Sequence, residues 1–196
     1  MDDEMRWDPM PLTGAVELFD AAPFRWWVSG GHALELHLGR SWRSHEDTDI
    51  GIMRRDASAV CGWLEGWDLA IASGGVLSPW DGRELAGSAE NNVWVRIDED
   101  SPWSLDITVG SGDEDSWVYR RDPDVVRPWD RAVLHSAEGI PYLAPDLQLL
   151  FKSKDTRAKD HEDARRVIPS LGAEQSRFLV QMLPSGHVWR SLLADL

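Results

Sequence analysis

Two aspartates near residue 50 have the type and spacing that phosphoryl-transfer chemistry uses. Asp47 and Asp49 alternate with Thr48 and Ile50, and a strand places every second side chain on the same face. If 47–53 is a strand, both carboxylates project together, with their α-carbons roughly 7 Å apart. Two acids held that close repel each other unless a cation neutralises them. The usual neutraliser is a hard divalent cation such as Mg²⁺, with substrate phosphates completing its shell.

A glycine pair upstream could supply the other half of such a site. Gly30 and Gly31 follow Ser29 and the short apolar run 26–28. A turn without β-carbons lets backbone N–H groups approach phosphate oxygens, and the start of the helix behind it favours negative charge. We therefore expect this turn, with Ser29 beside it, to hold a triphosphate while the aspartates hold the metal.

The pattern of apolar residues along the chain predicts a mixed sheet followed by a helical C-terminal third. Gly39 is expected to cap the second helix in a left-handed conformation. The Gly-rich stretch 74–92 is expected to be irregular, either as a substrate-facing loop or as a plain surface connection. Strands are expected at 24–28, 47–53, 67–72, 92–97 and 103–109, short sheet-completing runs at 117–119 and 132–134, and helices at 13–22, 32–38, 56–64, from 145 onward and over most of 155–195.

A third acid lies on one of these predicted strands. In 103–109 the apolar residues Leu105 and Ile107 face one way, while Asp106 and Thr108 face the other. From the residues alone, Asp106 is either a solvated strand aspartate or a functional acid.

The segment 30–50 resembles the DNA polymerase β-type nucleotidyltransferase superfamily. It is most similar to the branch that holds the aminoglycoside 2''-adenylyltransferases and lincosamide nucleotidyltransferases. In that branch a Gly-Gly-x-Ala helix leads through Gly-Arg to an Arg-x-His-x-Asp-x-Asp strand. The matching positions here are Gly30, Gly31, Ala33, Gly39, Arg40, Arg43, His45, Asp47 and Asp49, and His32 stands where such proteins often carry Trp.

The resemblance implies an α/β (α+β) nucleotidyltransferase fold with a mixed, twisted sheet flanked by helices. It implies a catalytic core at 1–140 and a helical subdomain at 141–196 packed on that core. It also implies that Asp47, Asp49 and Asp106 are the catalytic and metal-binding acids, with Asp106 a metal ligand, a general base for the acceptor hydroxyl, or both. The nucleotide-binding residues would be Ser29, Gly30, Gly31, Arg43 and Lys154.

A basic cluster opens the helical third of this acidic protein. Its cations at 152, 154, 157 and 159 could contact a triphosphate. Related proteins carry a similar helix end, so the resemblance draws attention to Lys154, Lys159 and Asp160. The alternative is ordinary capping and surface pairing, because basic residues favour a helix C-terminus and acids the start of the next helix.

Composition narrows the function classes. The chain of 196 residues fits one domain, or a core with a small helical annex. Its net charge of −14 argues against broad nucleic-acid binding, because such a surface repels phosphate backbones. There is no apolar signal core and no stretch long enough to cross a membrane, so we expect a cytoplasmic protein. A single cysteine, Cys61, excludes an internal disulfide.

The remaining motifs add little. His45 could orient a carboxylate or contact phosphate, but the nearby aspartates and the lack of cysteines favour a hard oxygen site over zinc. The chain has no P-loop, no dinucleotide-binding glycine motif and no esterase elbow, which lowers the odds of those enzyme classes.

We therefore expect a Mg²⁺-dependent nucleotidyltransferase with one or two bound ions. It would move a nucleoside monophosphate, most simply AMP from ATP, to a hydroxyl of a small molecule. An aminoglycoside- or lincosamide-like antibiotic is the acceptor class that the resemblance implies, and the resemblance is compatible with a homodimer. The alternatives are a transferase of the same fold that modifies a protein or a tRNA end, as a toxin would, and a non-catalytic nucleotide-binding protein.

Overall fold

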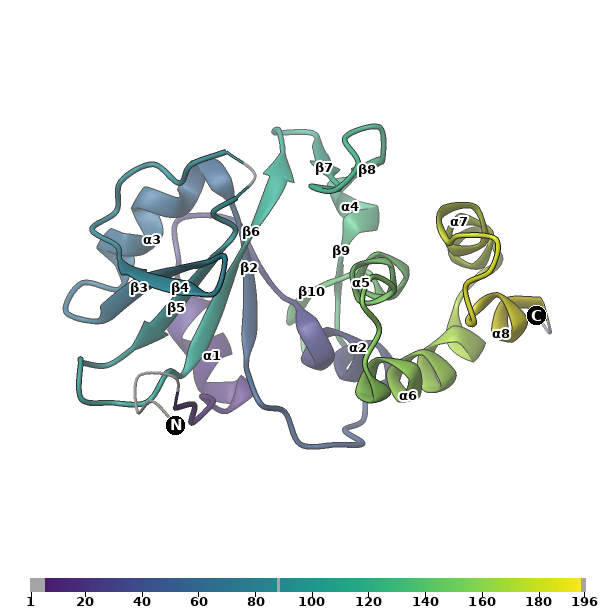
Figure 1. Cartoon of the computed structure of the whole chain (residues 1–196), viewed down its shortest axis with the longest axis horizontal. Helices are drawn as coiled ribbons and strands as arrows, with labels where there is room; N and C mark the ends of the chain where they lie inside the picture. Colours follow the sequence, from purple (N-terminus) through teal and green to yellow (C-terminus); the bar gives the residue numbers. More distant parts are fainter. Residues whose placement is uncertain (1–5, 88, 195–196) are drawn as a thin grey trace.

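The computed structural model describes residues 6–87 and 89–194 and contains a mixed, twisted sheet with helices packed on it (Figure 1). The main path of the sheet runs in the order β4-β3-β5-β6-β2-β1-β10-β9, and β7 and β8 extend from β6. This is the mixed α/β architecture that the sequence predicts. The strands are β1 (Trp26–Val28), β2 (Asp49–Met53), β3 (Asp68–Ser73), β4 (Val76–Pro79), β5 (Asn92–Arg96), β6 (Leu105–Gly112), β7 (Ser116–Val118), β8 (Val126–Pro128), β9 (Val133–His135) and β10 (Pro141–Leu143).

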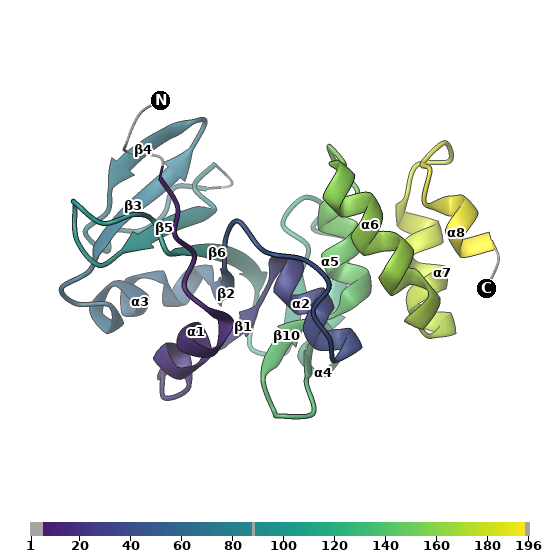
Figure 2. The same cartoon turned by 90° about the horizontal axis from the view of Figure 1, so that it is seen from below.

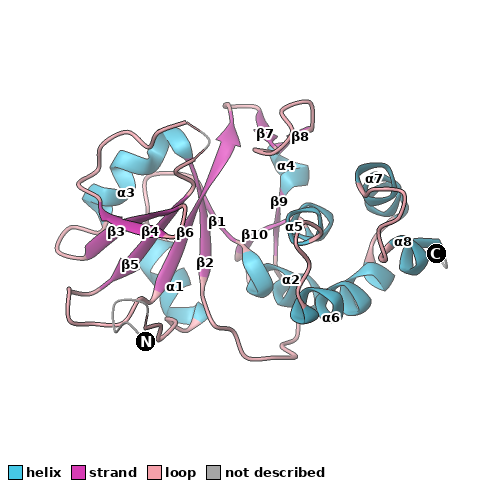
Figure 3. Ribbon diagram, in the orientation of Figure 1, coloured by secondary structure: helices cyan, strands magenta, loops and turns pink. Residues whose placement is uncertain are grey.

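The later helices stand together beside the β9–β10 end of the sheet (Figure 3). None of the helices within 6–87 and 89–194 is long and apolar enough to cross a membrane. The α-helices are α1 (Leu12–Phe19), α2 (Gly30–Leu38), α3 (Ala57–Trp63), α4 (Trp129–Ala132), α5 (Pro145–Lys152), α6 (Ala158–Val167), α7 (Ala173–Met182) and α8 (Arg190–Ala194), with 3-10 turns at Arg54–Asp56 and Ile168–Ser170.

The central strands separate two apolar cores. Val28 and Ile52 lie in the core that α1 and α3 cover. Their neighbours Trp27 and Met53 lie in the other core, together with buried residues of α5, α6 and α7. Because successive strand residues point to opposite faces, a strand buried on both sides reads as a continuous apolar run. This is why β1 carries no polar residue.

Strand β2 lies between β1 and β6, antiparallel to the first and parallel to the second. It begins at Asp49, so the predicted strand start at residue 47 is wrong. The carbonyl of Thr48 still accepts a hydrogen bond from the Asp106 N–H (2.9 Å). The Thr48 side chain, however, is buried and donates to the Met10 carbonyl (2.7 Å). Asp47 therefore sits at the end of the preceding loop and not inside the strand.

Other boundaries differ by a few residues. Helix α2 begins at Gly30, two residues earlier than predicted, and the irregular stretch 74–92 contains the edge strand β4. Gly39 has the predicted left-handed conformation (φ 63°) and ends α2, its N–H donating to the carbonyls of Glu35 and Leu36.

The helical C-terminal third follows directly from a strand of the sheet. Strand β10 pairs in parallel with β1 and in antiparallel with β9, and α5 follows it directly. Helix α6 then lies beside α2 and the loop that follows it (Figure 2). The division into a core at 1–140 and a subdomain at 141–196 stays a prediction.

Candidate active site

Two of the three candidate acids face each other across neighbouring strands. Asp49 and Asp106 are direct register partners on the parallel strands β2 and β6, and Asp47 lies two residues before β2. Burial, followed by the charges of Asp47 and Asp106, raises the pKa of Asp49 well above its ordinary value. Burial likewise raises the pKa of Asp106 to about 7, although the amide nitrogen of Asn92 donates to both of its oxygens (2.9 Å each). The structure thus gathers the three predicted acids into one electrostatically coupled group.

This group fits a divalent cation. Three carboxylates form a hard, all-oxygen donor set, which suits Mg²⁺ and not zinc. Burial, and after it the repulsion between like charges, raises the pKa values of Asp49 and Asp106. A bound cation would remove that repulsion.

The turn before α2 touches the same group. Ser29 is buried at the N-cap position, and its N–H donates to the Asp49 carbonyl (2.9 Å). Gly30 has a left-handed backbone (φ 65°), and a β-carbon at this position would overlap the Asp49 carboxylate. Its N–H donates to the side-chain oxygen of Gln148 on α5 (2.9 Å). Gly30 is therefore needed for the close approach of Asp49, and its amide already has a partner from α5.

Arg43 reaches the cleft but is already engaged. Its guanidinium makes a bidentate pair with the buried Asp163 of α6 through Nε–Oδ1 and Nη2–Oδ2, each 3.0 Å long. The same guanidinium lies so close to Gly31 that a β-carbon there would overlap it. Arg43 thus braces the loop that carries Asp47 against α6, and its predicted phosphate contact stays a prediction.

The cations of the basic cluster divide into paired and unpaired groups. Lys152 is buried and forms ion pairs with Asp160 (2.8 Å) and Asp163 (3.1 Å). Arg157 also pairs with Asp160, and Lys159 pairs with Glu46 in the loop before β2 (2.7 Å). Lys154 is exposed and forms no ion pair within the described chain. Of the cluster, Lys154 is thus the residue whose charge is available to a ligand.

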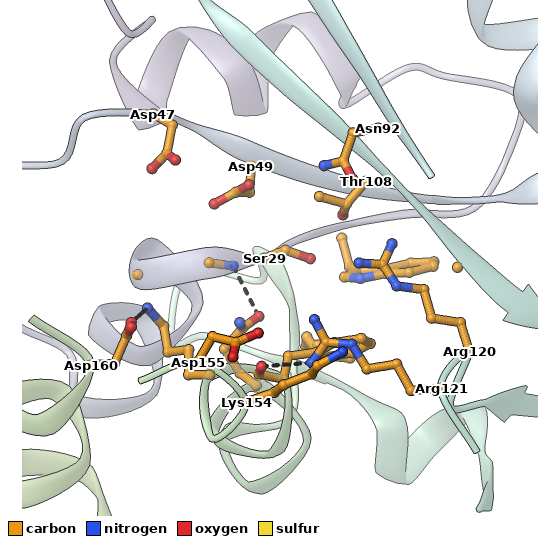
Figure 4. Close-up of a pocket in the computed structure, with 18 of the residues that line it drawn as sticks. Ser29, Asp47, Asp49, Asn92, Thr108, Arg120, Arg121, Lys154, Asp155 and Asp160 are labelled. Carbon is orange, nitrogen blue, oxygen red and sulfur yellow. Dashed lines mark hydrogen bonds and ion pairs between the residues drawn. The ribbon is translucent and has the colours of Figure 1, made fainter. Parts of the chain in front are cut away.

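The aspartates at 47 and 49, the glycine turn and the basic cluster line one pocket of about 450 Å³ (Figure 4). Of the predicted site residues, Ser29, Gly30, Gly31, Arg43, Asp47, Asp49 and Lys154 are in its lining. Asp106 is not, but its partner Asn92 is. The sequence analysis missed the polar lining residues Asn92, Thr108, Arg120, Arg121, Gln148 and Asp155, as well as apolar ones such as Trp27 and Phe151.

A histidine pair lies behind the turn. The rings of His32 and His45 lie with centroids 3.8 Å apart and their planes tilted by 32°, and His45 Nε2 lies 3.1 Å from Glu35 Oε2. Burial lowers the pKa of His32 to about 4 and lowers that of His45 as well. Arg43 Nη1 lies 3.0 Å from His45 Nδ1. Because a guanidinium only donates, Nδ1 accepts, and the ring proton sits on Nε2, facing Glu35. This arrangement supports the brace, while His45 Nε2 makes no hydrogen bond within the described residues.

The geometry agrees with known structures. ANT(2'')-Ia in solution, described as an antibiotic-resistance factor, aligns with 94% of this chain and 91% of its own at 18% identity, with a TM-score of 0.59. ANT(2'')-Ia in complex with adenylyl-2''-tobramycin covers 90% of this chain and 93% of its own at 18% identity, with a TM-score of 0.54. The lincosamide antibiotic adenylyltransferase LnuA, bound to lincomycin, covers 81% and 94% at 22% identity, with a TM-score of 0.55. The chain thus has the nucleotidyltransferase fold.

A sequence comparison narrows the class. Residues 12–72 match the profile of the aminoglycoside-2''-adenylyltransferase family. The matched segment contains α1, β1, the glycine turn, α2 and both aspartates of the β2 approach. No curated protein matches the chain. The predicted resemblance to the aminoglycoside and lincosamide branch of the superfamily is therefore confirmed.

Proposed function

We propose that the protein is a Mg²⁺-dependent nucleotidyltransferase that moves AMP from ATP to a hydroxyl of a small molecule. The observation that carries this proposal is the meeting of Asp47, Asp49 and Asp106 beside the glycine turn of α2. Carboxylates from a strand pair and a helix N-terminus in one cleft suit a metal-bound triphosphate. The fold and the family match support the same class of reaction.

Asp47, Asp49 and Asp106 would hold the metal. A metal held there would supply positive charge to offset the negative charge that builds up on the departing pyrophosphate. Ser29 and Gly31 at the start of α2, with Lys154 on the rim, would hold the triphosphate. Arg43 would keep the Asp47 loop in place through Asp163.

The reaction itself is a substitution at the α-phosphorus. The acceptor oxygen forms a bond to that atom while the bond to the β-phosphate oxygen breaks, and pyrophosphate leaves with the bonding electrons. The hydroxyl proton passes to a carboxylate, for which Asp106 is the candidate because a carboxylate beside a bound cation stays ionised near neutral pH and can accept a proton. Asn92 holds that carboxylate in place through both oxygens.

An antibiotic hydroxyl is the first acceptor class to test, since ANT(2'')-Ia and LnuA were solved with adenylyl-tobramycin and lincomycin. The experiment uses ATP labelled at the α-phosphate, Mg²⁺ and a panel of aminoglycosides and lincosamides. Labelling of one drug that is lost with EDTA, and lost in both Asp47→Asn and Asp49→Asn, supports the proposal. Glu114→Gln, a surface variant whose carboxylate pairs with Arg55, is the matched control and should keep activity. Nucleotide binding without labelling of any drug, protein or tRNA would contradict the transferase reading.

A further inference from the structure

Two adjacent arginines in the turn after β7 have no role in the chemistry described above. The Arg120 guanidinium is half-buried and, within the described chain, has neither a hydrogen bond nor a carboxylate within 4 Å. Arg121 Nη1 donates to the Phe151 carbonyl (2.9 Å). Both guanidiniums lie 5.3 Å from the centroid of the Phe151 ring. Both side chains extend from the turn into the pocket (Figure 4).

A half-buried cation without a directly paired acid is costly, and the charge of the buried Asp106 offsets only part of that cost for Arg120. Burial, followed by the charge of Arg121, lowers the pKa of Arg120. An arginine nevertheless keeps its proton, so the repulsion between the two guanidiniums persists. Other half-buried arginines of this chain have acids beside them, for example Arg43 with Asp163 and Arg96 with Asp68. The Arg120–Arg121 pair is thus a part of the cleft wall where a negative charge from outside would be stabilised.

The shape of the surface is consistent with a ligand there. Arg120 and Arg121 line the pocket that contains the aspartates, and they also line a neighbouring hollow of about 530 Å³. Arg54 and Ser111 lie on the far wall of that hollow. An anionic group between the two hollows would meet both guanidiniums, whose planar forks match the oxygens of phosphate and carboxylate.

We propose that Arg120 and Arg121 form an anion-binding subsite of the cleft, which takes a phosphate or carboxylate group. Two sources share this chemistry: the polyphosphate of the nucleotide and an acidic group on the acceptor. If the acceptor is the source, a polycationic molecule would be repelled here and an acidic one preferred. The part played by the subsite in catalysis rests on the proposed function, whereas anion binding itself does not.

Calorimetric titration with pyrophosphate in EDTA tests the subsite without metal or acceptor. The Lys154→Ala background reduces binding at the other rim of the pocket, and all variants are compared within it. Arg120→Gln should weaken pyrophosphate binding at least tenfold, and Arg120→Lys should restore part of the affinity. Arg131→Gln is the matched control, because Arg131 is an exposed arginine that lines a different hollow and pairs with Glu174. Equal affinity in Arg120→Gln and in the control would overturn the proposal.

Melting temperatures show whether a variant loses pyrophosphate binding because it is misfolded. Within the described residues Arg120 has no hydrogen bond to lose, and the loss of its contact with the Phe151 ring is opposed by the relief of a costly buried charge, so Arg120→Gln should melt close to the parental temperature. Arg121→Gln removes a contact with Phe151, and it serves as a second variant only if it also melts normally.

A second titration identifies the source of the anion. With Mg²⁺ and a non-hydrolysable ATP analogue, a similar loss of affinity in Arg120→Gln assigns the subsite to the nucleotide polyphosphate. Unchanged analogue binding, with pyrophosphate binding lost, assigns it to an acidic acceptor. If no acceptor is ever labelled while pyrophosphate binding still depends on Arg120, the subsite stands and the proposed function fails.

Discussion

Asp49 and Asp106 are direct partners across the parallel strands β2 and β6, so two carboxylates that the chain separates by 57 residues share one small volume. Burial raises the pKa values of both, and the charge of Asp47 raises them further. Without a cation, the native state therefore holds these protons more tightly than the unfolded chain does.

The pH dependence of stability follows from this difference. The pKa of Asp106 is about 7 in the folded state and 3.8 ordinarily. An acid with a raised folded pKa stabilises the protein fully at low pH, and its contribution declines as the pH rises from about 4 to about 7. In EDTA, this carboxyl should lower the melting temperature by a few degrees between pH 5.5 and pH 8. Saturating Mg²⁺ should raise the melting temperature more at pH 8 than at pH 5.5.

The variant Asp106→Asn isolates this contribution. His32 works in the opposite direction, because burial lowers its pKa to about 4 and its stabilising effect fades as the pH falls below about 6.5. Both proteins contain His32, so the difference between their melting curves belongs to Asp106 and to the part of the Asp49 pKa shift that the Asp106 charge causes. If the melting temperatures of the parent protein and Asp106→Asn change equally with pH in EDTA, the raised pKa of Asp106 is contradicted.

Gly30→Ala should be more damaging than its backbone conformation alone explains. Gly30 and Gly39 have nearly the same left-handed φ, 65° and 63°, but a β-carbon at Gly39 meets nothing within 4 Å. Gly39→Ala should thus cost only the conformational strain of about 1 kcal/mol. Gly30→Ala adds a clash with Asp49, so we expect it to lose a further ~1–3 kcal/mol of unfolding free energy and most transferase activity. Chemical denaturation measures both, and equal losses would show that Asp49 can move aside.

The three lysines at the end of α5 and the start of α6 should respond differently to replacement by Met. Lys152→Met breaks a buried pair with Asp160 and Asp163 and should cost about 3 kcal/mol or more of unfolding free energy. Lys159→Met removes a pair with an exposed Glu46 and should cost less than about 1 kcal/mol. Lys154→Met should leave stability unchanged and raise the KM for ATP several-fold. An unchanged KM would remove Lys154 from the triphosphate site.

Arg43→Ala distinguishes two roles of Arg43, which are holding the Asp47 loop against α6 and contacting the phosphates of the nucleotide. Loss of the bidentate pair leaves the buried Asp163 with Lys152 as its cation, so unfolding free energy should fall by about 2–3 kcal/mol. The looser Asp47 loop should lower kcat more than it raises the KM for ATP. A pure phosphate contact would give the reverse pattern, with normal stability and a raised KM. Denaturation and steady-state kinetics together decide between them.

The local parts of the site could be predicted from the sequence. Asp47, Asp49 and the glycine turn lie within 21 residues of each other, and their order is the signal. Alternation on a strand placed Asp106 on the polar face of β6, and the family resemblance was needed to select it as a site residue. The start of β2 was misplaced because the side chain of Thr48 turns to Met10, a partner from a distant segment that no local pattern indicates.

The remaining parts depend on tertiary contacts. Arg120 and Arg121 lie in a turn, and Gln148 faces Gly30 across 118 residues of sequence. The sequence around residue 155 gives no sign of which lysines are buried. In the fold Lys152 is buried and Lys154 is exposed. Charge in a sequence shows which residues can form pairs, but the packing of α5 on α6 decides which of them do.

The Arg43–Asp163 pair also affects how short an active fragment of this chain can be. A fragment that ends after α5 would retain all three acids, the glycine turn and Gln148. It would lack α6, and with it the buried carboxylate that anchors the loop leading to Asp47. Such a fragment would contain the reactive groups but not their alignment. The shortest functional unit of this chain is therefore set by its scaffolding and extends at least through α6, well past the last residue that performs chemistry.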